Sequence, residues 1–174
     1  GGRMLFVSTR EIYGEPATPG QNFREEDMGI VDPAQQRACY PESKRLAETL
    51  VAAYVAQHGV DAVIARLAHT YGPGMLRSDT RVQASFADKV LNGEDIVLKS
   101  TGELVRSYTY IGDAASGMFW ALLAGEELVY NVANDAATVS IRELAEIFLR
   151  ACGNDSLSLR FDLPDGTTPT GWST

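Results

Sequence analysis

Two short apolar segments on either side of a long amphipathic segment constrain the fold of this chain most strongly. Residues 4–7 are continuously apolar, residues 41–58 carry apolar side chains at helical spacing, and residues 60–67 form a second apolar run. Pro41 suits the first turn of a helix, and Gly59 suits its end. A continuous apolar run is typical of a strand buried on both faces of a parallel sheet. The order strand, helix, strand therefore predicts a βαβ unit.

The rest of the chain continues to alternate between helical and extended patterns. A long loop is predicted at 14–36, a length typical of a functional or disordered segment. Asp113 and Ser140 can each cap a helix, and Glu143 is placed to complete a capping box with Ser140. The pattern predicts helices at 80–92, 114–124 and 141–152, and strands at 96–98, 107–111, 130–132 and 157–161.

Composition limits the classes of partner. The 174 residues are 45% hydrophobic and 22% charged, as expected for one globular domain or a large piece of one, and no apolar run approaches the roughly 20 residues of a membrane-spanning helix. Asp and Glu number 23 against 15 Lys and Arg, a net charge of -8 that repels nucleic acids and anionic membranes. We therefore expect neither as a partner, and we expect a local group of arginines to hold any anionic ligand.

The two cysteines and the two ends of the chain give further expectations. Cys39 and Cys152 lie far apart and match no metal-ligand spacing, so we expect no metal site, no disulfide and a reduced cytoplasmic protein. The apolar run at 4–7 is too short for a secretory signal. Because the chain opens directly on a strand and ends in a Gly-, Pro- and Thr-rich stretch at 164–174, we expect a piece of a longer protein.

Tyr40 and Lys44 are the first candidates for chemistry. Their spacing of four residues places a phenol and an ammonium on one face of a helix. An ammonium beside a phenol stabilises the phenolate, the form in which a tyrosine removes a proton from an alcohol. Pro41 disfavours helical backbone at the preceding residue, so Tyr40 is expected to cap the helix and Lys44 to point back over the first turn. The alternative is a packed tyrosine beside a solvated lysine.

Further polar residues follow the two apolar strands. Ser8, Thr9 and Glu11 come after the first strand, and His69 comes after the second. Open α/β sheets bind ligands at the carboxyl ends of their parallel strands, so hydroxyl, carboxylate and imidazole groups can face one ligand there. The alternative is that Ser8 or Thr9 only satisfies loop backbone groups and that His69 is structural.

Four motifs occur along the chain in a distinctive order. They are Thr-x-Glu-x-Tyr-Gly at 9–14, Tyr-x-x-x-Lys at 40–44, Arg-x-x-x-Thr-Tyr-Gly-Pro at 66–73 and Arg-Ser-Tyr-Thr-Tyr-Ile-Gly-Asp at 106–113. In combination the chain resembles the extended short-chain dehydrogenase/reductases that act on nucleotide sugars. Within that family, residues 37–50 are most similar to UDP-glucuronate decarboxylases, whose nearest relatives are dTDP-glucose 4,6-dehydratases and sugar 4-epimerases.

The resemblance implies a fold and a division into domains. The fold class is α/β, with the second half of a Rossmann-type doubly wound parallel sheet and a small α/β substrate-binding lobe. Residues 1–75 are then the C-terminal half of an NAD-binding domain and carry the catalytic residues. Residues 76–174 mostly form the substrate-binding lobe, with 107–134 partly returning to the sheet. A nucleotide-sugar substrate and a homo-oligomeric state are also implied.

The resemblance further implies a reaction at C4 of the sugar. A bound NAD takes hydride from C4 while Tyr40 removes the hydroxyl proton. Lys44 holds the nicotinamide ribose, and Thr9 hydrogen-bonds the same sugar oxygen. Glu11 manages protons near C5, and decarboxylation, epimerisation or dehydration follows.

Three more residues are assigned by the resemblance alone. His69 contacts both cofactor and substrate. Arg81 and Arg106 bind the substrate, and Arg106 lies at its diphosphate, which an arginine can grip through two parallel hydrogen bonds.

The chain also departs from this family. Dehydratases carry Asp where Arg10 stands, and many relatives carry Asn where His69 stands. No Gly-x-x-Gly-x-x-Gly motif occurs in the 174 residues, so we expect this chain alone to bind NAD poorly and to be inactive. Two other functions stay open: a non-catalytic module for nucleotide-sugar binding or assembly, and an extended-type carbonyl reductase.

Overall fold

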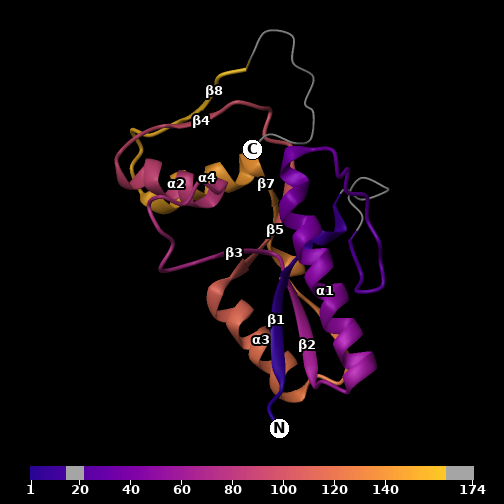
Figure 1. The fold of residues 1–174 in the computed structure, drawn as a ribbon. Coiled ribbons are helices and arrows are strands. Elements are labelled where there is room, and N and C mark those ends of the chain that lie inside the picture. The colour runs from indigo at the N-terminus through magenta and orange to yellow at the C-terminus, as the bar shows by residue number, and fades with distance from the viewer. Residues whose placement is uncertain (15–21, 164–174) are drawn as a thin grey trace. The chain divides into compact units, whose positions relative to one another are not determined.

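The computed structural model describes residues 1–14 and 22–163, which form two compact units (Figure 1). The first unit comprises Gly1–Thr70 and Thr109–Asn134. The second comprises Tyr71–Tyr108 and the residues from Asp135 onward. Parts of the loop predicted at 14–36, namely 15–21, and the stretch 164–174 lie outside the described residues.

The first unit is built on a parallel sheet with the strand order β1-β2-β6. Strand β1 pairs with β2 from Met4 opposite Ala62 to Thr9 opposite Leu67, which confirms the predicted βαβ unit. Val63, Ile64 and Ala65 in β2 are fully buried, as a central parallel strand requires. The strands span Met4–Thr9 (β1), Ala62–Leu67 (β2) and Val129–Val132 (β6).

Two helices flank this sheet, α1 (Cys39–His58) and α3 (Ile111–Ala124) (Figure 1). Helix α1 ends at Gly59, whose φ of 62° is the left-handed conformation that terminates helices and favours glycine. Two short 3₁₀ helices precede α1 along the chain, η1 (Arg10–Tyr13) directly after β1 and η2 (Gln36–Ala38) directly before α1.

The second unit has its own apolar core. Helices α2 (Val82–Leu91) and α4 (Ile141–Cys152) pack together, and β4 (Ile96–Leu98) pairs in parallel with β8 (Leu159–Phe161). A further sheet, whose residues are divided between the two units, has the order β3-β5-β7, from strands His69–Tyr71, Val105–Tyr110 and Thr138–Ser140, and η3 (Asp135–Ala137) precedes β7. The buried core consists of Phe86, Ile96, Leu98, Tyr108, Leu144 and Ala145.

The structure corrects two predicted caps and confirms one. Asp113 is not the cap of α3: Tyr110 holds that position and makes no capping hydrogen bond with its side chain, and Asp113 lies in the first turn. Tyr40 is not a cap either, because α1 begins at Cys39 and Tyr40 is its second residue. Pro41 is tolerated there since a proline in the first turn removes no intrahelical hydrogen bond. Ser140 and Glu143 form the predicted capping box.

No described helix is long and apolar enough to cross a membrane. Cys39 and Cys152 are both free thiols. A cytoplasmic location stays a prediction.

Candidate active site

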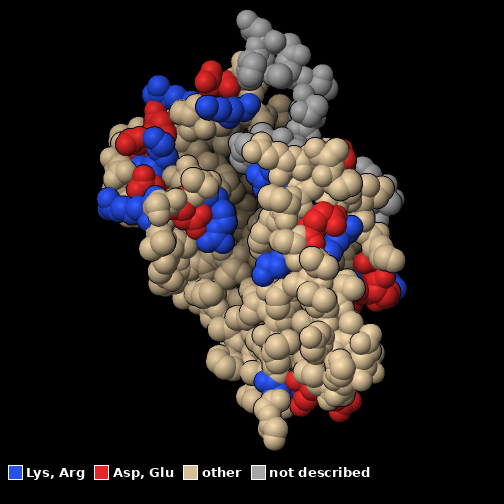
Figure 2. All heavy atoms as spheres, in the orientation of Figure 1, with Lys and Arg blue, Asp and Glu red and all other residues tan. Residues whose placement is uncertain are grey.

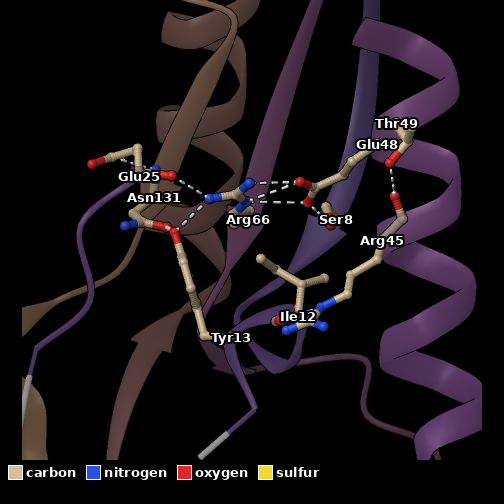
Figure 3. A network of polar contacts seen from close by, with 9 residues as sticks. All are labelled: Ser8, Ile12, Tyr13, Glu25, Arg45, Glu48, Thr49, Arg66 and Asn131. Carbon is tan, nitrogen blue, oxygen red and sulfur yellow. Dashed lines mark hydrogen bonds and ion pairs between the residues drawn. The ribbon is translucent and has the colours of Figure 1, made fainter. Parts of the chain in front are cut away.

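A nearly buried ion pair joins α1 to β2 in the first unit (Figure 3). Arg66 Nη2 donates to Glu48 Oε2 at 2.7 Å, and Arg66 Nε lies 3.1 Å from both carboxylate oxygens. Each side chain is only 10% exposed. Ser8 at the end of β1 donates its hydroxyl to Glu48 Oε1. The Glu48 carboxylate thus holds the helix to both strands near their carboxyl ends.

The other edge of the Arg66 guanidinium holds the segments that follow β1. Arg66 Nη1 donates to the Tyr13 hydroxyl at 2.7 Å and to the Glu25 carbonyl at 2.8 Å, and the Tyr13 hydroxyl donates to Asn131 Oδ1 at 2.8 Å (Figure 3). Burial raises the pKa of Tyr13. Burial also lowers the pKa of Arg66, but the hydrogen bonds to Glu48 and Tyr13 outweigh it and raise the pKa above its ordinary value. The guanidinium therefore stays charged.

Backbone carbonyls anchor the loop beside this network. Arg45 in α1 donates to the carbonyls of Ile12 at 2.7 Å and Gly29 at 2.8 Å. A Cβ on Gly29 would lie 1.3 Å from the Tyr13 carbonyl oxygen, so only glycine fits this close approach. These contacts fix η1 and the loop at residue 29 against α1.

Thr9 and Glu11 meet at the turn that ends β1. Thr9 caps η1: its hydroxyl oxygen accepts a hydrogen bond from the Glu11 backbone N–H at 3.2 Å. A hydroxyl that accepts one bond keeps its proton available to donate another. Thr9 therefore does satisfy a loop backbone group, which was the alternative to a ligand-binding role. This hydrogen bond does not use the proton of the Thr9 hydroxyl, which can still be donated to a ligand.

Tyr40 and Lys44 lie one helical turn apart on α1, which packs against β1 and η1. Lys44 Nζ donates to the Val7 carbonyl of β1 at 2.9 Å and lies 5.0 Å from the centre of the Phe6 ring. Tyr40 is 45% exposed, and its hydroxyl has no hydrogen-bond partner among the described residues. The helix thus places an ammonium on the strand that ends at Thr9, with an accessible phenol one turn before it.

Arg10 and His69 contact each other just beyond the ends of β1 and β2. Arg10 Nη1 lies 3.3 Å from His69 Nε2. Because a guanidinium only donates, His69 Nε2 is the acceptor in this hydrogen bond. Burial lowers the pKa of Arg10, and the charge of Glu11 opposes that shift.

The remaining two predicted residues, Arg81 and Arg106, belong to the second unit. Arg81 is the residue before α2, and its Nε donates to both carboxylate oxygens of Asp79 at 3.0 and 2.9 Å. Arg106 lies in β5 opposite Val139, with Nη1 donating to the Val105 carbonyl at 3.3 Å.

Sequence reasoning missed Glu48, Tyr13 and Asn131. One signal was available: Arg66 is a charged residue at the end of a continuously apolar strand, and a charge in such a place needs a buried partner. Glu48, four residues after Lys44 on the same helix, could then have been proposed as that partner.

The chain is similar to known proteins in both sequence and fold. The sequence profile described as the NAD dependent epimerase/dehydratase family matches residues 1–133. UDP-glucuronic acid decarboxylase 1 of Xenopus tropicalis is 42% identical over 118 residues, which are 68% of this chain and 28% of that protein. UDP-glucuronic acid decarboxylase 6 of Arabidopsis thaliana is 38% identical over 146 residues, 84% of this chain and 42% of that protein. The chain thus spans less than half the length of these curated relatives.

The fold comparison agrees with the sequence comparison. The structure of the UDP-glucose 4-epimerase of Thermus thermophilus, a complex with NAD, superposes with a TM-score of 0.77 and is 27% identical. The match covers 95% of this chain and 52% of that one. The α/β fold with a parallel sheet is therefore of the Rossmann type, and the chain belongs to the NAD dependent epimerase/dehydratase family.

Proposed function

We propose that this chain is part of an NAD-dependent enzyme that oxidises C4 of a nucleotide sugar and then decarboxylates, epimerises or dehydrates it. One observation carries the proposal: Lys44 of α1 is hydrogen-bonded to β1, the strand that ends at Thr9 and is followed by η1 with Glu11. The Tyr40 phenol and the Lys44 ammonium thus lie on α1, which packs against the Thr9 hydroxyl's strand β1 and against η1, which carries the Glu11 carboxylate. Relatives named as nucleotide-sugar decarboxylases and epimerases support the substrate class.

Each of the four residues has its own role in the proposed reaction. Tyr40, as the phenolate, accepts the proton of the C4 hydroxyl, and the Lys44 ammonium stabilises the charge on the phenolate. Thr9 donates to the same sugar oxygen with the proton that its capping role leaves available. Glu11 takes or returns a proton at the carbon next to the new carbonyl. NAD, when bound, supplies the acceptor for the C4 hydride.

The residues present fit one part of an NAD site. Tyr40 is exposed and Lys44 lies one turn along the same helix, which suits contact with a ribose that approaches α1. Arg81 and Arg106 are proposed to bind the diphosphate and sugar, and His69 to line the site between cofactor and substrate. A homo-oligomer is proposed on the family resemblance alone.

A substitution of the phenol tests the proposal. In an enzyme that contains this chain with a complete NAD-binding segment, Tyr40→Phe is expected to lower turnover by about 100-fold or more and to leave nucleotide-sugar affinity unchanged. Tyr54→Phe, on an exposed position of the same helix, is the matched control and is expected to keep full turnover. Undiminished turnover of Tyr40→Phe would contradict the proposal.

Glu11→Gln separates the two halves of the reaction. Because Glu11 acts after the C4 hydride has left, the variant is expected to accumulate the 4-keto sugar, which mass spectrometry of quenched reactions detects. An unchanged rate of full turnover would remove Glu11 from the mechanism and leave the role of Tyr40 standing.

A further inference from the structure

Arg10 carries a partly buried charge that is paired with no carboxylate of the described residues. Other partly buried arginines of the first unit have such a partner: Arg66 pairs with Glu48 at 2.7 Å and Arg3 with Asp61 at 3.0 Å. Within residues 1–14 and 22–163, the only hydrogen-bonding neighbour of the Arg10 side chain is the His69 imidazole. An imidazole that accepts from a guanidinium is neutral, so the described carboxylate that acts on the Arg10 charge is that of Glu11, which forms no ion pair with it.

This arrangement is costly unless an anion completes it. Desolvation disfavours an unpaired charge, and the lowered pKa of Arg10 reflects that burial. A guanidinium has five N–H donors in a planar fork, of which His69 occupies one. The unused donors match the two oxygens of a carboxylate.

The position of Arg10 identifies the part of the substrate that it faces. Arg10 stands between Thr9 and Glu11, the residues proposed to act at C4 and at the neighbouring carbon. Thr9 and Leu67 are paired in the register of β1 and β2, so Arg10 and His69 follow two neighbouring strand ends. Arg10 thus follows the same strand end as the residues proposed to act at these carbons, and an acidic group on the neighbouring ring carbon is the part of the substrate assigned to it.

We propose that Arg10, positioned by His69, binds the carboxylate of a uronic acid in the nucleotide-sugar substrate. The inference rests on the proposed function and narrows it: Arg10 is the residue that selects an acidic sugar over a neutral one. His69 is a positioning residue for Arg10, because its imidazole holds one nitrogen of the Arg10 guanidinium.

Binding of matched ligands tests this role without catalysis. The 174-residue chain is titrated by NMR with UDP-glucuronate, UDP-glucose and UDP, which share the nucleotide and differ at the sugar. Wild type is expected to bind UDP-glucuronate at least about 10-fold more tightly than UDP-glucose. Arg10→Gln is expected to reduce this ratio to near one while the affinity for UDP stays the same. Arg10→Lys keeps the charge without the planar fork and is expected to retain part of the preference.

Two controls keep the result interpretable. Arg37→Gln removes the same charge at an exposed position of η2 and is expected to keep the full ratio. Dispersed amide spectra of each variant establish that it is folded. A ratio unchanged in Arg10→Gln would overturn the Arg10 assignment alone. Failure of wild type to bind any of the three ligands would count against the proposed function and the Arg10 assignment together.

Discussion

Glu48 is the residue on which the polar network of the first unit depends most. Its carboxylate accepts hydrogen bonds from both Arg66 and Ser8, and it is 8% exposed. Glu48→Gln leaves the Arg66 guanidinium buried without its counter-charge, and such losses cost about 3 to 5 kcal/mol. We expect a fall of this size in the free energy of unfolding, measured by urea denaturation with an unchanged m-value.

Glu42→Gln is the matched control for this prediction. Glu42 lies on the same helix and faces Arg45 at 3.3 Å, but its side chain is 40% exposed. Exposed ion pairs contribute at most about 1 kcal/mol, so a small change is expected. Equal effects of the two substitutions would show that burial does not set the strength of the Glu48 contact.

Because of Tyr108, the free energy of unfolding is expected to fall at alkaline pH. Burial in the core of the second unit raises the pKa of Tyr108 to about 12, against a small opposing effect of the Arg106 charge. The unfolded chain therefore loses this proton first, so the contribution is fully present below about pH 10 and is lost as pH rises toward 12.

The loss is expected to approach about 2 to 3 kcal/mol and to be absent in Tyr108→Phe. Urea denaturation at stepwise increasing pH measures it, with Tyr54→Phe as the control at an exposed position. Parallel pH curves for wild type and Tyr108→Phe would contradict the assignment.

Among single residues, Thr9, Glu11, Tyr40 and Lys44 could be predicted as site residues from the sequence, because each stands in a motif of fixed spacing. The contact between Glu48 and Arg66 could not be predicted in the same way. It joins a helix to a strand 18 residues away, and its geometry depends on how that helix packs.

The stability of helix α4 depends on the capping box at its N-terminus. Ser140 accepts from the Glu143 backbone N–H at 3.1 Å, and the Glu143 carboxylate accepts from the Ser140 backbone N–H at 2.7 Å. Ser140→Ala is expected to lower the free energy of unfolding by about 1 kcal/mol. Ser43→Ala, at an exposed site in α1 that makes no such box, serves as comparison, and thermal unfolding of both variants measures the difference.

Long periodic elements and the short apolar strand β4 were predictable, and two short polar strands were not. Helix α1 and strands β1 and β2 follow from apolar runs and their Pro and Gly boundaries. Strands β3 and β7 have three residues each and are rich in Thr, Ser and His, so no periodicity distinguishes them from loops. Their extended backbone results from pairing within a sheet, which is a tertiary effect.

At the scale of the whole chain, the first unit exposes large apolar side chains on an edge strand and on a helix. Strand β1 forms one edge of the described sheet, and Met4 and Val7 on it are 44% and 41% exposed. On α3, Phe119 and Leu123 are 62% and 79% exposed, and Figure 2 shows a broad uncharged surface where β1 and α3 lie. Such edges and patches promote association.

We therefore expect the 174-residue chain to form a dimer or larger oligomer through the free edge of β1. Val7→Lys is expected to shift the assembly toward monomer in multi-angle light scattering, because a charge on an edge strand opposes pairing. Leu50→Lys, on the exposed face of α1, is the control and is expected to leave the assembly intact. A monomer at high concentration, with slowly exchanging amides at 4–8, would show that this edge is protected within one chain.

Main-chain carbonyls anchor much of the loop beside Arg66 and Arg45, together with the Glu25 carboxylate, which accepts from the Asn131 N–H at 2.7 Å, and the Phe23 ring, which stacks on Tyr13. The carbonyls of Phe23, Glu25 and Gly29 accept hydrogen bonds from Asn131, Arg66 and Arg45, and a carbonyl does so whatever side chain its residue carries; position 29 alone must stay glycine. Neighbours such as Met28, 91% exposed, can therefore vary while the anchors persist. A randomised library at such positions would redesign the surface beside Tyr13 and still inherit a correctly folded loop.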